Sequence, residues 1–125
     1  MFGATELYNA LNVSTVTNLL DGWGTGKALF NEPIIPENCT GTETINFYFI
    51  ASINGGLDYG DYQYNVNCRS ATYKKSLILA NAVFSILNRV SIPDGFMICN
   101  MLQTIPPSDN TDTYNTPITV KIKMR

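Results

Sequence analysis

Residues 62–90 read YQYNVNCRSATYKKSLILANAVFSILNRV, and within this stretch the spacing of the apolar residues changes from alternation to steps of three and four. The first half has the pattern of a β-strand with one buried face, formed by Tyr62, Tyr64, Val66 and Cys68. The second half has the apolar stripe of an α-helix, formed by Leu77, Ala80, Val83, Phe84 and Leu87. The stretch therefore predicts a strand that leads directly into a helix over residues 71–89, with Ser70 as the N-cap.

A second strand with the same alternation comes before this one and begins at Glu43. Its two predicted faces carry Ile45, Phe47, Phe49, Ala51 and Ile53 on one side and Asn46, Tyr48, Ile50 and Ser52 on the other. Asn54, Gly55 and Gly56 interrupt the pattern, so we expect the two strands to form a hairpin.

Two further strands are predicted after the long helix, over residues 96–105 and 116–124. Residues 106–115 are rich in Asp, Asn, Thr and Pro and are expected to form the loop between them. The alternation in the last strand places Ile118, Val120, Ile122 and Met124 inward and Thr119, Lys121, Lys123 and Arg125 outward.

The first 22 residues predict a bent helical arm, in which Ser14 is a candidate N-cap for the second half. Its apolar residues at helical spacing are Leu7, Tyr8, Leu11, Val16, Leu19 and Leu20. The glycines at positions 22, 24 and 26 favour a turn or loop over regular structure. Residues 27–30 predict a short strand, and Pro33 and Pro36 keep residues 31–41 extended and irregular.

These elements predict the α+β class, with an antiparallel sheet of about four strands and helices packed on one face. We expect one domain over residues 1–125, made of a helical arm (1–22), a loop or extended arm (23–42), and the sheet with the long helix (43–125). Because Tyr48 and Ile50 fall on the side away from the helices, a neighbouring molecule is expected to cover part of that face.

The composition excludes several classes of function. Charged residues make up 14% of the chain and the net charge is −2, so there is no general attraction for nucleic-acid phosphates. There is no histidine, and Cys39, Cys68 and Cys99 are spaced like neither a disulfide framework nor a zinc site, so we expect reduced, buried thiols. The start of the chain does not resemble a signal peptide and no apolar run is long enough to span a membrane, so a cytosolic protein is expected.

The candidate motifs for chemistry are weak. Residues 22–28 contain three glycines and Lys27, but the glycine and hydroxyl positions of a phosphate-binding loop are missing. The acidic pairs at positions 58 and 61 and at positions 109 and 112 lack the ligand spacing of a calcium loop and are better explained as turn residues. The sequence therefore predicts no catalytic residues, no metal site and no cofactor, and a protein that is not an enzyme.

Two stretches resemble the tail terminator, or tail completion, proteins of long-tailed bacteriophages and the related neck proteins that form rings. The first contains Glu6-Leu7-Tyr8-Asn9-Ala10-Leu11 and Val16-Thr17-Asn18-Leu19-Leu20-Asp21-Gly22, followed by an extended segment over 30–36. The second is the strand 62–70, which runs into the long helix, together with the closing hairpin that ends in residues 118–123. The strand before the helix departs from the family pattern because it is rich in asparagine.

The resemblance implies a structural virion protein that forms a ring, expected to be hexameric, at the head-proximal end of the tail. Such a ring ends growth of the tail tube, binds the tail tube protein and neck or connector proteins, and lets DNA pass through its lumen without sequence-specific binding. The protein would then be found in the virion, and in the host cytoplasm during assembly. The residues predicted to form the subunit interface are Trp23, Lys27, Phe30, Tyr48, Ile50, Lys121 and Lys123.

Two alternatives remain open at this point. The chain could be another neck or head-completion ring protein, since the resemblance is to an order of elements. It could also be a small-molecule or peptide-binding α+β module, in which the exposed aromatic face is a platform for the ligand.

Overall fold

A computed structural model describes residues 3–53, 60–93, 95–108 and 112–124 of the chain. The elements are, in chain order, α1 (Ala4–Leu11), α2 (Ser14–Thr17), β1 (Gly22–Trp23), β2 (Gly26–Lys27), β3 (Leu29–Phe30), β4 (Thr44–Ile53), β5 (Gly60–Ser70), α3 (Tyr73–Leu87), β6 (Val90–Ile92), β7 (Gly95–Met101) and β8 (Tyr114–Met124). Predictions for residues 54–56, Asp58, Asp109 and Arg125, and for the side chains of Ile53 and Met124, lie outside the described residues.

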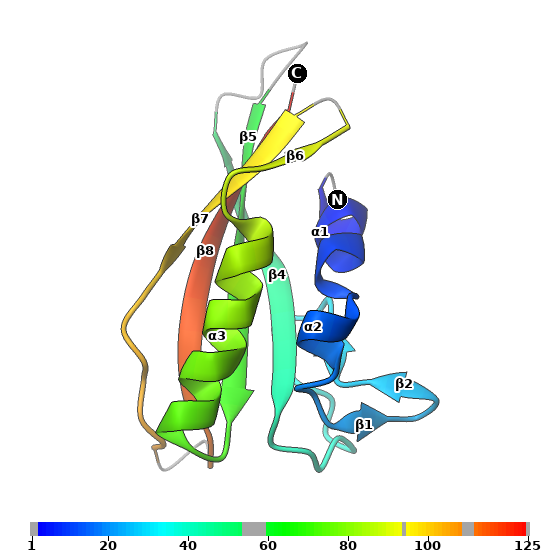
Figure 1. The fold of residues 1–125 in the computed structure, drawn as a ribbon, viewed down its shortest axis with the longest axis vertical. Coiled ribbons are helices and arrows are strands. Elements are labelled where there is room, and N and C mark those ends of the chain that lie inside the picture. The colour runs from blue at the N-terminus through cyan, green and yellow to red at the C-terminus, as the bar shows by residue number, and fades with distance from the viewer. Residues whose placement is uncertain (1–2, 54–59, 94, 109–111, 125) are drawn as a thin grey trace.

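The main sheet has the strand order β3-β4-β5-β8-β7-β6, with β3 parallel to β4 and every other pair antiparallel (Figure 1). The fold class is mixed α and β as predicted, but the prediction of about four antiparallel strands is wrong, because six strands are described. The two further strands of this sheet are β3, which has two residues and lies within the short strand predicted over 27–30, and β6, which has three residues and was not predicted. An element as short as β6 contains no repeating pattern, so periodicity does not predict it.

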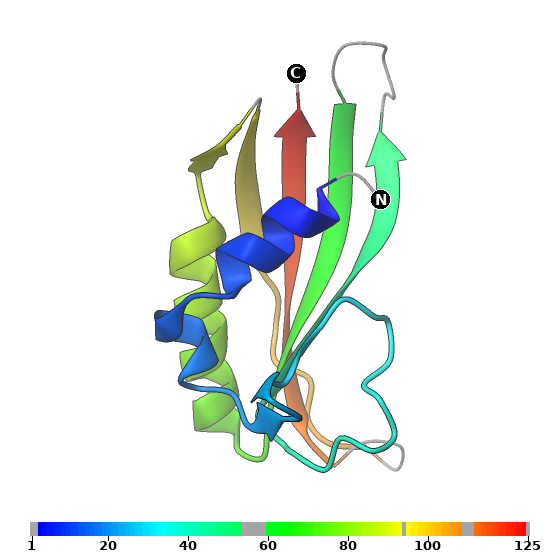
Figure 2. The ribbon, with the colours of Figure 1, turned by 90° about the vertical axis from the view of Figure 1, so that its right-hand side faces the viewer.

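The helices cover one face of the sheet, where α1 crosses the strands and α3 runs beside them (Figure 2). The core between the layers includes Leu7, Leu11 and Val16 from the helical arm, none of which is exposed to solvent. From the sheet it includes Ile45, Phe47, Tyr64, Val66, Cys68, Ile118, Val120 and Ile122. The predicted arm is therefore packed into the core.

Helix α3 begins two residues later than predicted. Its N-cap is Thr72, whose hydroxyl accepts a hydrogen bond of 3.2 Å from the backbone N–H of Lys75. The predicted cap, Ser70, instead donates its hydroxyl to a carboxylate oxygen of Glu43 at 2.8 Å. The predicted cap for the second part of the arm, Ser14, is also wrong, because α2 is preceded by Val13 and has no side-chain cap.

Three members of the predicted stripe of α3, Ala80, Val83 and Leu87, are confirmed as buried, and the other buried positions differ from the prediction. Leu79, Ala80, Val83 and Leu87 are buried together with Ser76, whereas Leu77 and Phe84 are only partly buried. Ser76 is accommodated in the core because its hydroxyl donates to the backbone oxygen of Cys68 at 2.8 Å and lies 2.8 Å from the hydroxyl of Thr116. A polar residue with satisfied hydrogen bonds thus occupies a place that the hydrophobic pattern gives to an apolar one.

Strand β4 contains a β-bulge that reverses its alternation. The pairing with β5 shifts between Phe49 and Ala51, so that Ala51 lies opposite Gln63. The prediction that Ala51 continues the inward face is wrong, since the inserted residue Ile50 moves it to the side away from the helices. The predicted inward positions before the bulge are confirmed: Ile45 and Phe47 are buried, and Phe49 packs against the core.

The closing hairpin is confirmed with different ends. Strand β7 stops at Met101 and β8 starts at Tyr114. The prediction of strand over residues 102–105 is wrong, although Ile105 still forms a pair of backbone hydrogen bonds with Asn115, at 2.7 and 3.0 Å. The inward set of β8 is confirmed for Ile118, Val120 and Ile122, all of which are buried.

The glycine-rich segment after the arm contains the predicted turn, at Gly24 and Thr25, but Gly22 and Gly26 on either side of it lie in strands. Strands β1 and β2 pair as a small antiparallel ribbon, and Gly24 at its turn has a φ of 57°. This left-handed conformation is strained for residues with a Cβ atom, which explains a glycine at the turn.

Asp21 ties the end of the helical arm to the start of β4. Its carboxylate accepts hydrogen bonds from the backbone N–H groups of Thr42 (2.8 Å) and Glu43 (3.1 Å). Its own backbone N–H donates to the oxygen of Glu43, and its oxygen accepts from Ala28, both at 2.9 Å. A Cβ atom at Gly41 would come within 2.8 Å of the Asp21 side chain, so this position requires glycine for close packing.

Replacing Asp21 with alanine is expected to lower the free energy of unfolding by roughly 1–3 kcal/mol, because two backbone donors lose a charged acceptor. Urea unfolding followed by circular dichroism measures this. The matched control is Asp112→Ala at an exposed position, for which a change below about 0.5 kcal/mol is expected. Equal stability of the two variants would contradict the structural role of Asp21.

Candidate interaction surface

The face of the sheet away from the helices is here called the open face. Cross-strand partners place on it Asn46, Tyr48 and Ala51 from β4, Asp61, Gln63, Asn65, Asn67 and Arg69 from β5, Asn115, Pro117, Thr119, Lys121 and Lys123 from β8, and Phe96, Ile98 and Asn100 from β7. In the views of Figures 1 and 2, none of the described helices lies on this side. A sheet face with this many uncharged polar side chains is suited to contacts that remain partly hydrated.

A ladder of side-chain hydrogen bonds crosses three strands of the open face, from Tyr48 of β4 through Asn65 and Asn67 of β5 to Asn115 of β8. Asn65 donates to the hydroxyl of Tyr48 at 2.9 Å and to the side-chain oxygen of Asn67 at 3.2 Å. Asn67 also accepts from Asn115 at 3.0 Å, and the side-chain oxygen of Asn115 is buried without a hydrogen-bond partner among the described residues. The ladder fixes the orientation of Tyr48, so its ring forms a rigid part of the surface.

The charges of the open face are few and partly paired. Lys123 lies 3.8 Å from the carboxylate of Asp61, an exposed ion pair that contributes little to stability. Asp61 lies within β5 and is paired with Lys123 of β8, so the prediction that it is a turn residue is wrong. Lys121 lies opposite Gln63 on one side and Ile98 on the other.

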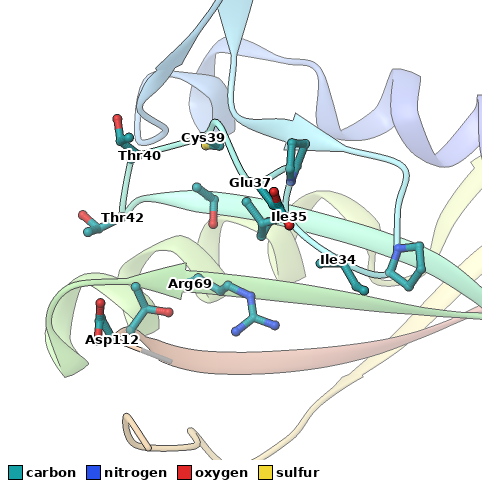
Figure 3. A pocket seen from close by; sticks show the side chains of 13 residues that line it. Ile34, Ile35, Glu37, Cys39, Thr40, Thr42, Arg69 and Asp112 are labelled. Atoms are coloured by element: carbon teal, nitrogen blue, oxygen red, sulfur yellow. The ribbon is translucent and has the colours of Figure 1, made fainter. Parts of the chain in front are cut away.

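A cleft of about 690 Å³ lies where residues 33–44 pass over one end of this face (Figure 3). Arg69 reaches into it from β5, and its Nε donates to the side-chain oxygen of Asn46 at 3.3 Å. Burial lowers the pKa of the Arg69 guanidinium, and the nearby Tyr48 opposes this shift. Ile34, Glu37 and Asp112 also line the cleft, so it presents apolar surface and charges of both signs.

The amide of Asn46 holds the segment that forms the roof of this cleft. Asn46 is completely buried and donates to the backbone oxygens of Glu32 (3.1 Å) and Pro33 (3.3 Å). These bonds explain how an irregular, proline-containing segment keeps one path over the sheet.

Among residues 3–53, 60–93, 95–108 and 112–124, no group of three or more His, Cys, Asp or Glu residues could hold a metal ion. No helix in the described part of the chain is long and apolar enough to cross a membrane.

The three cysteines are free thiols, and two of them, Cys68 and Cys99, are buried. Burial raises the pKa of Cys99 to about 11, and burial together with the neighbouring Cys99 raises the pKa of Cys68 further. Cys39 is only half-buried in the segment over the cleft. The thiolate is the reactive form, so the two buried cysteines should react slowly.

Maleimide at neutral pH is therefore expected to label one thiol per folded chain, Cys39, and three per chain after unfolding in guanidinium. Mass spectrometry of the labelled protein counts the adducts. Cys39→Ser should remove the label from the folded protein, and rapid native labelling of that variant would show that the core around Cys68 and Cys99 opens readily.

The predicted interface residues fall into two groups. Tyr48, Ile50, Lys121 and Lys123 lie on or beside the open face, where 49% of the Ile50 side chain is exposed. Trp23, Lys27 and Phe30 lie instead in β1, β2 and β3. Phe30 is 8% exposed, and its ring contacts that of Trp23 edge to face at a centroid distance of 5.5 Å.

Two of the exposed apolar residues, one on the open face and one beside the cleft, are absent from the predicted interface. Phe96 is 41% exposed on β7 and Ile34 is 75% exposed beside the cleft. The alternation with the inward residues Met97 and Cys99 could have placed Phe96 outward. Ile34 gives no such signal, because residues 31–41 have no period.

Comparison with solved structures shows that the chain has a known fold. No protein-family model and no curated protein sequence matches the chain. A chain in the virion of a native gene transfer agent (GTA) particle has a similar structure, with a TM-score of 0.64 over 94% of this chain and 90% of that chain. The two sequences are 12% identical over this match. This chain therefore shares its fold with a component of a gene transfer agent virion.

Proposed function

We propose that this protein is a structural component of a phage-like virion, without catalytic activity of its own. The observation that carries the proposal is the fold shared with a chain of the gene transfer agent virion, because the match covers nearly all of both chains. A fold alone does not determine function, but the match extends over nearly the whole of both chains and is not limited to a common motif.

The specific role that we propose is a ring, expected to be hexameric, at the head-proximal end of the tail. The ring would end growth of the tail tube and join the tail to the head or neck, with the tail tube protein and neck or connector proteins as partners. It would be present in the virion, and in the host cytoplasm during assembly. The chain 1–125 would act as one domain in this role.

Two features support the proposal that this chain is a subunit of a ring through which DNA passes. The open face is left uncovered by the described helices and has exposed apolar residues beside its edges, as expected of a surface that a neighbour covers. The net charge of −2 and the asparagine-rich surface would hold passing DNA weakly and without regard to sequence.

Electron microscopy of the purified protein, alone and mixed with isolated tail tubes, tests this proposal. We expect closed rings alone or single rings at one end of each tube, and sedimentation as a discrete oligomer. A protein that remains monomeric under both conditions would contradict the ring, whereas rings without affinity for tube ends would favour another neck or head-completion protein.

The cleft beside Arg69 favours a second candidate, a small-molecule or peptide-binding module. Its volume is in the range of ligand sites, and it combines apolar walls with a half-buried guanidinium. A monomer whose Arg69 NMR resonances shift on addition of an acidic peptide would favour this function over the ring.

A further inference from the structure

The outer edge of β4 is paired over only part of its length. Strand β3 covers Ile45 and Asn46, and β4 then continues to Ile53. Among the described residues, no strand pairs with 48–53 on the side away from β5. An unpaired edge of this kind presents a row of backbone donors and acceptors to a further strand.

The pairing shows which residues direct their backbone groups outward. The N–H of Ile45 donates outward, to the oxygen of Ala28 at 2.9 Å, so by alternation the backbone groups of Phe49 also point away from β5. Strand β5 stays in regular register with β8, and its residues opposite Ile45 and Phe49 are Cys68 and Tyr64. The next residue of β5 in the same alternation is Tyr62, and its partner in β4, beyond the bulge, is Ser52. Ser52 is thus the next residue after Phe49 with an outward N–H.

The opposite end of the same sheet has a second edge, formed by β6. Strand β6 pairs with β7 through Val90, Ser91 and Ile92, and no other described segment bonds to its backbone. Figures 1 and 2 share their vertical axis, and in Figure 2 β6 lies at the same height as the far end of β4, on the opposite side of the sheet. One chain therefore carries two edges that face in different directions, which is the arrangement that head-to-tail association needs.

Exposed apolar side chains accompany both edges. The bulge residue Ile50 lies on the edge strand β4 and is 49% exposed. Phe96 is 41% exposed and lies opposite Ser91 of β6. Joining the two edges would bring these apolar groups of neighbouring copies together. A bulge can also protect an edge strand from unwanted pairing. An exposed isoleucine at the bulge would not add to that protection, because edges are protected by charged residues or proline.

We infer that neighbouring copies in the ring are joined by one continuous β-sheet, in which the edge of β4 at residues 48–53 pairs with β6 of the next copy. This inference rests on the ring proposed above. The partner is a second copy of this chain, because the complementary edge is present on the same sheet. The ring would then be held by backbone hydrogen bonds, with Ile50 and Phe96 as the apolar contact beside them.

Ser52→Pro tests the pairing, with Ser52→Ala as the matched control. Proline removes the outward N–H of this residue and places its ring at the edge, whereas the bonds from β4 to β5 are made by neighbouring residues. Alanine keeps the N–H. Sedimentation should show the alanine variant assembled like wild type, and the proline variant with each association constant lowered at least about fivefold for the lost hydrogen bond.

Hydrogen exchange of the wild type gives a second measurement that does not depend on a variant's folding. Peptides covering 48–53 and 90–92 should exchange about tenfold more slowly in the assembled protein than in the dilute monomer. Unchanged exchange of these peptides in an assembled ring, or normal assembly of a folded Ser52→Pro variant, would overturn the edge pairing and leave the ring itself standing. A wild type that never assembles would overturn both.

Discussion

Replacing Phe47 with alanine is expected to lower the free energy of unfolding by about 3–5 kcal/mol. Phe47 is completely buried at the centre of β4, opposite Val66, and its ring lies 6.4 Å from that of Tyr8 on α1. Truncation would leave a cavity between the sheet and the helical arm, both of which keep their positions through other contacts. A domain of this size has a total stability of about 5–15 kcal/mol, so the variant is expected to be close to unfolding at 37 °C.

Two other phenylalanines provide controls with the same chemical change. Phe84 is partly buried on α3, so Phe84→Ala should cost less than Phe47→Ala. Phe96 is 41% exposed, and Phe96→Ala should change the free energy of unfolding by less than about 1 kcal/mol. Urea unfolding of the three variants measures the order, and a cost at Phe96 equal to that at Phe47 would mean that the faces of the sheet are assigned wrongly.

Replacing Ile50 with glutamate is expected to abolish ring formation while the subunit stays folded. Half of the Ile50 side chain is exposed in the subunit, so the charge is solvated there and costs little. At a contact between subunits the same charge would be buried without a partner, at a cost of roughly 3 kcal/mol. This lowers each association constant by about a hundredfold, and a ring needs every contact.

The matched control is Ile78→Glu on α3, because Ile78 is 46% exposed but belongs to the helix layer and not to the open face. Sedimentation and circular dichroism on the same samples separate assembly from folding. Loss of the oligomer in the Ile50 variant alone supports the proposed interface. Equal loss in both variants would point to a general effect of the added charge, and an intact oligomer in the Ile50 variant would place the contact elsewhere.

The candidate site was predicted only in part, and the reason differs between its two groups of residues. The alternation in β4 and β8 placed Tyr48 and Lys121 on the face away from the helices, since a regular strand carries this information locally. Phe30 belongs to the segment 22–38, which was predicted as an arm that contacts a neighbouring subunit, and no repeat in this segment indicates what its side chains contact. The structure buries Phe30 beside Trp23. The cleft around Arg69 depends on a segment whose path is set by hydrogen bonds to Asn46, a contact across fourteen positions of the chain.

The sequence by itself determined the elements whose residues repeat, namely β4, β5, α3 and β8, because side-chain period and backbone conformation are both local properties. Only the tertiary structure decided the rest. The parallel pairing of β3 with β4 and the short strand β6 were not predicted, and the bulge at Ile50 turns Ala51 to the open face through its register with β5. Ser76 occupies the core because Cys68 and Thr116 satisfy its hydroxyl. Apart from β6, which pairs with the adjacent strand β7, the deciding partner is distant along the chain, and a hydrogen bond to a distant residue leaves no periodic trace in the sequence.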